Sequence, residues 1–157
     1  MSPKTFYDLF ADREDCFLAL IDRELDAVAE VVCPVYECEP EWSMRIRSGL
    51  GALLSYLDAN PAVCGLLFVA SLHAGVRVQE RRLRVLGVLA RAIAVDAGAD
   101  HGSSLSLLAE GVVGGAFTVI QTRVASGDSR SLVGLLEELA ATIVLLYDGA
   151  GVLSDAA

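Results

Sequence analysis

The chain has 157 residues, of which 54% are hydrophobic and 21% charged, so it carries enough apolar surface for a compact core and is not intrinsically disordered. Its formal charge of −9 repels nucleic acid and anionic lipid, so DNA binding would have to be argued from a motif. The charge is concentrated at the start, where residues 1–44 hold 11 acidic side chains against three basic ones.

The composition indicates neither a membrane protein nor an exported one. The longest uncharged apolar run, residues 62–76, is too short to span a bilayer and contains Ser71 and His73. The N-terminus lacks the basic region and apolar core of a signal peptide. The cysteines at positions 16, 33, 38 and 64 form no CxxC pair, and the chain has only two histidines. We therefore expect free thiols, no bound metal or cofactor, and a cytoplasmic protein that does not contact a membrane.

The spacing of apolar residues is helical almost everywhere, and no stretch alternates long enough to indicate a sheet, so the predicted fold class is all-α with about seven helices. A short helix over Lys4–Phe10, with Ser2 as its cap, precedes a long helix that begins after Asp12. The long helix carries an apolar stripe and is predicted to end at Pro34.

Five more helices follow, and each is separated from the next by Pro, Gly or Ser-rich breaks. The expected ranges are about Pro40–Asp58, Pro61 to about Leu72, Val76–Ala97, Leu105–Ala125 and Leu132–Tyr147. The Val76–Ala97 helix is amphipathic with a basic outer face.

The last two helices carry more apolar surface than one core can use, which predicts a partner subunit. Gly111 and Gly115 lie one turn apart, and each costs about 1 kcal/mol against alanine unless close helix approach offsets it. The alternative is that these glycines are incidental. We expect a homodimer whose interface includes Leu136, Leu139 and Ile143 beside the two glycines.

Two segments are similar to a known family. The opening residues 2–17, SPKTFYDLFADREDCF, resemble the end of the helix-turn-helix and the start of the linking helix in TetR-type transcriptional regulators. Residues 110–117, EGVVGGAF, followed by a Gly-Asp turn and a leucine-rich helix ending near Tyr147, are similar to the dimerisation helices of that family. The resemblance implies a TetR-like C-terminal regulatory domain whose last two helices form a dimeric four-helix bundle.

The resemblance also implies an incomplete DNA-binding head, because the sequence begins without the first two helices of the family's helix-turn-helix. Residues 1–11 would be a remnant of the recognition helix, and residues 12–157 the ligand-binding and dimerisation domain. By resemblance the DNA contacts would be Ser2, Lys4, Thr5, Tyr7 and Arg13, and operator DNA would be a partner only of a full-length parent. The alternative is that these residues form a solvated leftover segment.

The family binds a small, often apolar or aromatic molecule between its middle helices. On the Leu105–Ala125 helix a carboxylate and an amide share a face with an aromatic ring, and buried polar groups need partners that a ligand could supply. The candidate lining residues are Trp42, Tyr56, Phe68, Leu72, His73, Glu110, Phe117 and Gln121. Ordinary core packing is the alternative for the aromatic residues, and an ion pair with an arginine of the Val76–Ala97 helix is the alternative for Glu110.

No nucleophile comes with a plausible base and no glycine-rich loop follows a strand, so an enzyme is not expected. The expected function is a small-molecule-sensing transcriptional regulator, a repressor by resemblance. The competing hypothesis is a ligand-free helical dimer that serves as an interaction scaffold, which a filled core around Trp42, Tyr56, Phe68 and Phe117 would favour.

Overall fold

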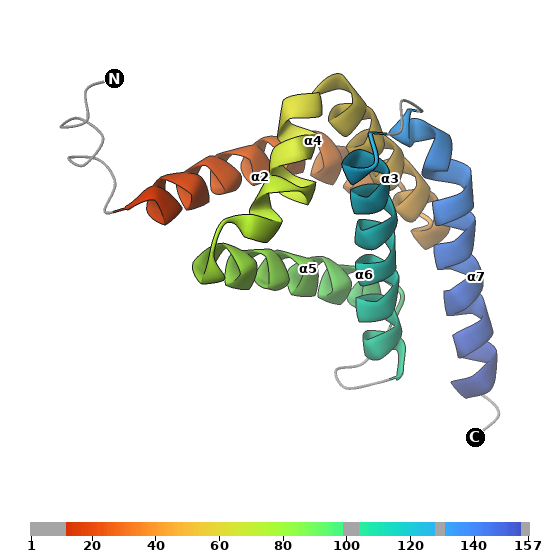
Figure 1. Cartoon of the computed structure of the whole chain (residues 1–157). Helices are drawn as coiled ribbons and strands as arrows, with labels where there is room; N and C mark the ends of the chain where they lie inside the picture. The colour runs from red at the N-terminus through yellow and green to blue at the C-terminus, as the bar shows by residue number, and fades with distance from the viewer. Residues whose placement is uncertain (1–11, 99–103, 128–130, 155–157) are drawn as a thin grey trace.

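The computed structural model describes residues 12–98, 104–127 and 131–154, and it is helical in all three ranges with no strand among them. Its α-helices are α2 (Arg13–Cys38), α3 (Trp42–Ala59), α4 (Pro61–Phe68), α5 (Val76–Asp96), α6 (Ser104–Ala125) and α7 (Leu136–Ser154), with the 3₁₀ helices η1 (Ala70–His73) and η2 (Leu132–Leu135) (Figure 1). The predicted all-α class is confirmed. The short helix expected at Lys4–Phe10 lies outside the described residues.

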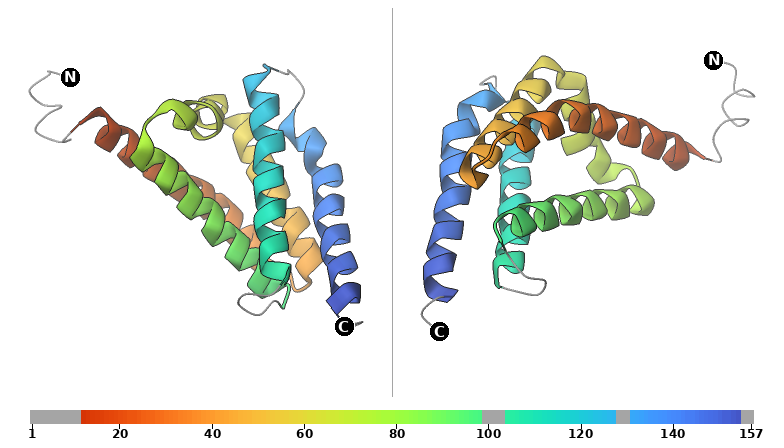
Figure 2. Two further views of the ribbon diagram at one scale, coloured as in Figure 1. Left: turned by 60° about the horizontal axis from the view of Figure 1, so that its bottom comes forward. Right: turned by 180° about the vertical axis from the view of Figure 1, so that it is seen from behind.

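The helices form two groups (Figures 1 and 2). Helices α6 and α7 run antiparallel, side by side, at one end of the molecule, while α2 and α5 extend away from them. Helix α3 packs against both α2 and α7 and so joins the two groups. The start of α2 is therefore far from the α6–α7 pair.

Two clusters of buried side chains hold the helices together. The first core cluster consists of Ile46, Ala90, Ala94, Ala109, Val112, Val113, Ile143 and Tyr147. The second consists of Leu54, Leu57, Cys64, Phe68, Ile120, Leu132 and Leu135. Helix α3 contributes to both, so its apolar stripe forms the spine of the core, as its periodicity indicates.

The prediction that the long helix ends at Pro34 is wrong, because α2 continues through this proline to Cys38. Proline removes one helical hydrogen bond, but contacts beyond it hold the last turn in place. Tyr36 packs so closely on Gly49 of α3 that a Cβ at that glycine would lie 2.9 Å from the Tyr36 ring. The Tyr36 hydroxyl also donates a hydrogen bond to Asp96 at 2.8 Å. Burial and this hydrogen bond raise the pKa of Tyr36 far above its usual range, so the phenol stays neutral.

Two other helix boundaries differ from the expected ones. The helix predicted from Pro61 to Leu72 ends at Phe68, and η1 takes its place from Ala70. Ser71 of η1 is 2% exposed and donates its hydroxyl to the Leu67 carbonyl at 2.7 Å, a local bond that competes with regular helix. The last helix begins with η2 and continues beyond Tyr147 to Ser154.

Asp58, near the end of α3, caps the start of the η2–α7 segment. Its carboxylate accepts hydrogen bonds from the backbone N–H of Leu132 at 2.8 Å and of Val133 at 3.1 Å, and from the Ser131 hydroxyl. Burial opposes ionisation of Asp58, but these hydrogen bonds outweigh it and lower the pKa of the carboxyl. The cap therefore ties the last helix to α3.

We predict that Asp58→Ala lowers the free energy of unfolding by about 1–2 kcal/mol at pH 7, the usual cost of a lost helix cap. Because the pKa of Asp58 is lowered by folding, its contribution is full above the unfolded-state pKa of about 4 and is lost as the pH falls through the folded-state pKa. Urea unfolding between pH 7 and pH 2.5 should show the difference between wild type and variant shrinking at the acid end. The control is Asp26→Ala, since the exposed Asp26 side chain bonds to no described residue. Equal losses in the two variants would contradict the assignment of the cap.

Candidate functional site

A ring stack connects α4 and α6 in the second core cluster. Phe68 and Phe117 lie nearly parallel with their ring centres 4.6 Å apart. The guanidinium of Arg82 on α5 lies over the Phe117 ring, 4.4 Å from its centre. Phe68 and Phe117, which were expected to line a pocket, therefore pack directly against each other.

Trp42, the third aromatic residue of the predicted pocket, lies elsewhere. It packs against the first core cluster, where its ring centre is 4.8 Å from that of Tyr147. Its indole N–H is buried and has no hydrogen-bond partner in the part of the chain that the structure describes. Because Trp42 and the Phe68–Phe117 stack belong to different clusters, the structure does not bring them together around one cavity.

The remaining pocket candidates differ in burial. Tyr56, Leu72 and Gln121 are half-buried, whereas His73 and Glu110 are exposed. Glu110 forms no ion pair with any arginine among the described residues. The carboxylate that the sequence places among apolar groups thus faces solvent.

Two surface depressions stand out, one between α2 and η1 and the other between α2 and α5, and neither is lined by Phe68 or Phe117. The first, about 380 Å³, is lined by Arg13, Glu14, Phe17, Ala70, His73 and Ala74. The second, about 400 Å³, is lined by Leu18, Asp22, Arg77, Glu80, Arg81 and Arg84. Both are open to solvent, and His73 is the one expected pocket residue that lines either of them.

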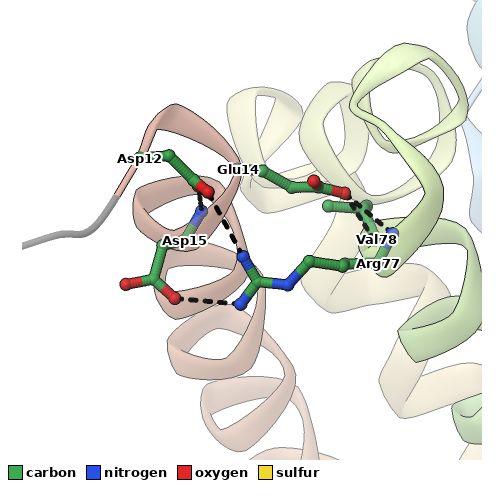
Figure 3. A network of polar contacts seen from close by, with 5 residues as sticks. All are labelled: Asp12, Glu14, Asp15, Arg77 and Val78. Carbon is green, nitrogen blue, oxygen red and sulfur yellow. Dashed lines mark hydrogen bonds and ion pairs between the residues drawn. The ribbon is translucent and has the colours of Figure 1, made fainter.

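The start of α5 is capped by a carboxylate from α2 (Figure 3). Oε1 of Glu14 accepts hydrogen bonds from the backbone N–H of Arg77 at 2.8 Å and of Val78 at 3.4 Å. The residue before the helix, Gly75, has φ +109°, and a Cβ there would lie 2.5 Å from that oxygen. Glycine is therefore needed both for the backbone conformation and for the space that the carboxylate occupies.

Ion pairs reinforce this cap. The Arg77 guanidinium lies between Asp12, 3.6 Å away, and Asp15, 3.1 Å away (Figure 3). One turn further along α5, Arg81 pairs with Asp22 of α2 at 2.6 Å. We call the contacts of Asp12, Glu14 and Asp15 with the start of α5 the α2–α5 clasp. The clasp uses three of the 11 acidic side chains in residues 1–44 and one arginine of the basic face of α5.

Of the residues expected to contact DNA, only Arg13 falls within the described ranges. It is the first residue of α2, is exposed, and lines the first depression. Ser2, Lys4, Thr5 and Tyr7 lie outside the described residues.

The residues expected at a dimer interface lie on two sides of the α6–α7 pair. Gly111 and Gly115 are exposed, and a Cβ at either would have open space around it. By contrast, Ile143 is 6% exposed in the first core cluster, and Leu136 and Leu139 pack against the second. The three α7 residues therefore pack within the chain's own core, and a different side of α7 faces solvent.

Glu14 and Arg82 take part in these contacts but are not among the sequence candidates. The glycine before α5 was a signal that could have led to Glu14. Gly75 has no side chain with which to cap the helix, so another segment can supply the cap. No comparable signal marks Arg82 among the arginines of α5.

Comparison with known proteins found no family model, no curated protein and no solved structure that matches this chain. Among the described residues, no group of three or more His, Cys, Asp or Glu side chains is arranged to hold a metal ion.

The clasp predicts a specific coupling between Glu14 and Gly75. Gly75→Ala should cost more stability than Gly98→Ala, because both glycines have positive φ but a Cβ at Gly98 meets nothing within 4 Å. We expect the excess loss to be about 1 kcal/mol smaller when both variants are made in a Glu14→Ala background, where only the strain of the Gly75 backbone, at φ 109° and ψ 174°, remains. Chemical denaturation of the four variants measures it. An excess of unchanged size without Glu14 would show that backbone strain alone is responsible.

Proposed function

We propose that this chain is the regulatory domain of a TetR-type transcriptional regulator, which forms a two-fold homodimer through α6 and α7 and senses a small molecule. The observation that carries the proposal is the apolar, unpartnered side of α6 and α7. The order of the helices, with a long first helix and an antiparallel pair at the end, supports the same assignment.

The exposed stripe of α6 consists of small and apolar side chains without charge. Its members, three or four residues apart, are Leu107, Gly111, Gly115, Thr118 and Thr122. Leu107 is 72% exposed. The hydroxyls of Thr118 and Thr122 donate to the carbonyls of Gly114 and Thr118, each at 2.8 Å, so their hydrogen-bonding needs are met within the helix. A second helix could approach such a stripe closely without burying an unpaired polar group.

The exposed side of α7 is apolar in its middle and is bounded by the exposed carboxylates of Glu138 and Asp148. Leu145 is 69% exposed and Leu146 46%. The hydroxyl of Thr142 donates to the Glu138 carbonyl at 2.7 Å. Pairing α6 and α7 with the same helices of a second copy gives a four-helix bundle, in which each copy covers the other's apolar surface.

A lipid bilayer is the other environment that could bury the apolar surface of these helices. By length and composition alone, Leu105–Ala125 could cross a membrane, and so could Trp42–Ala59 with Pro61–His73 if this pair, bent by 109°, were one span. A second copy fits better, because exposed Glu110 lies within the first of these segments, where lipid would have to accommodate its charge.

A ligand-free dimer scaffold is the second candidate function, and the Phe68–Phe117 stack favours it. In the scaffold the ring stack is permanent core. In the sensor the two rings separate, and the ligand packs against the face of one ring where the other ring packs now. The ligand thereby selects a conformation other than the one described here. The two hypotheses share the dimer and differ in ligand binding.

We expect sedimentation to show a dimer at micromolar concentration, since bundles of this type commonly bury about 2,000 Å² or more. Gly115→Leu should weaken the dimer while leaving the helical fold intact, because the monomer has open space at this position. Gly87→Leu is the matched control, as Gly87 has equal space but lies on α5. A monomeric wild type, or equal dissociation constants for the two variants, would refute the α6–α7 interface.

Ligand sensing predicts that at least one compound in a screen of apolar and aromatic metabolites raises the melting temperature in proportion to the logarithm of its concentration. Phe117→Leu should abolish the rise, whereas Phe17→Leu, in the first depression, should preserve it. If no compound raises the melting temperature and the dimer is intact, the scaffold replaces the sensor.

A further inference from the structure

Arg82 is a cation without a counter-ion. Its Nε is buried and has no hydrogen-bond partner among the described residues, and its Nη1 donates one long bond, 3.3 Å, to Oε1 of Gln79. No carboxylate of the described residues lies within 4 Å of it. Burial lowers the pKa of Arg82, because the charged form has lost water. Arg13, Arg84 and Arg91 also lack an ion pair with a described residue, but they are exposed and remain hydrated.

The surroundings of Arg82 are fixed from two sides. On one side the guanidinium covers Phe117, which stacks on Phe68. On the other side Nε2 of Gln79 donates to the Ser71 carbonyl at 2.8 Å, which turns Oε1 of the same amide toward Arg82. Among the described residues, the charge of half-buried Arg82 is stabilised by the ring face and one amide oxygen, which is less than a carboxylate would provide.

We propose that Arg82 binds the negatively charged group of a small molecule whose apolar or aromatic body packs against Phe68 and Phe117. The inference rests on the proposed sensing function and narrows its ligand to carboxylates and similar anions. Arginine suits this role because its planar fork can donate two parallel hydrogen bonds to one carboxylate. Binding moves the guanidinium off the Phe117 ring, toward the anion, and leaves the ring face to the body of the ligand.

The proposal has a consequence in the ligand-free protein. Replacing a residue that serves binding at the expense of stability can make the folded protein more stable, whereas replacing a residue that holds the core together makes it less stable. We expect Arg82→Met, which keeps the length and removes the charge, to raise the melting temperature of the unliganded protein. Arg84→Met, on the exposed side of the same helix, should leave it nearly unchanged. A fall for Arg82→Met larger than that for Arg84→Met would show that Arg82 is structural and would overturn the proposal.

The ligand class is tested with three acids and their amides at constant ionic strength: phenylacetate, 3-phenylpropionate and hexanoate against phenylacetamide, 3-phenylpropionamide and hexanamide. At about 10 mM we expect at least one acid to raise the melting temperature by about 2–4 °C and its amide to have a much smaller effect. The rise should disappear in Arg82→Gln and persist in Arg84→Gln.

The outcomes separate this inference from the proposed function. Equal shifts with an acid and its amide, or a shift that survives Arg82→Gln, would overturn the role of Arg82 while leaving a sensor of neutral ligands in place. No shift with any of the three acids would also overturn it. Failure of the proposed function would be recognised independently, by a monomeric protein in sedimentation.

Discussion

Two helices of this protein begin with a carboxylate that belongs to another helix. Glu14 of α2 caps α5, and Asp58 of α3 caps the η2–α7 segment. Each carboxylate satisfies backbone N–H groups that would otherwise lack partners and lies at the positive end of the helix dipole. Since each cap joins residues more than 60 positions apart, it fixes where the later helix starts relative to the earlier one. The apolar clusters then determine how the helices pack between these fixed starting points.

The periodicity of the sequence was enough to predict the helical class and most helix boundaries, because apolar residues three and four apart identify a helix wherever it packs. It failed at Pro34, where contacts of Tyr36 with Gly49 and Asp96 outweigh a local signal. It also could not find the two caps, since a carboxylate that binds a distant helix looks in sequence like any other acidic residue. Patterns of neighbouring residues therefore do not predict features that depend on contacts between segments far apart in the sequence.

The candidate site shows the same limit. The sequence placed Trp42, Phe68 and Phe117 together because aromatic residues on neighbouring helices are natural pocket walls, but the fold divides them between two clusters. It also placed Leu136, Leu139 and Ile143 toward a second subunit. A leucine-rich helix has two apolar sides, and composition does not indicate which of them the chain's own core uses. Gly111 and Gly115 of α6, by contrast, lie on the exposed side of their helix, and their place in an interface stays a prediction.

The proline inside α2 creates a point at which this helix can bend. Pro34 cannot donate to the Glu30 carbonyl, so the hydrogen-bond ladder has a gap between the clasp at the first turn and Tyr36 at the last. The 22 residues from Arg13 to Pro34 form a rigid helical segment roughly 30 Å long, at 1.5 Å per residue. A bend of about 5° at the proline would carry the far end through roughly 3 Å, by that same length. Small changes near Tyr36 would thus produce larger displacements at Arg13, which the clasp, the Arg81–Asp22 ion pair and the burial of Ile21 oppose.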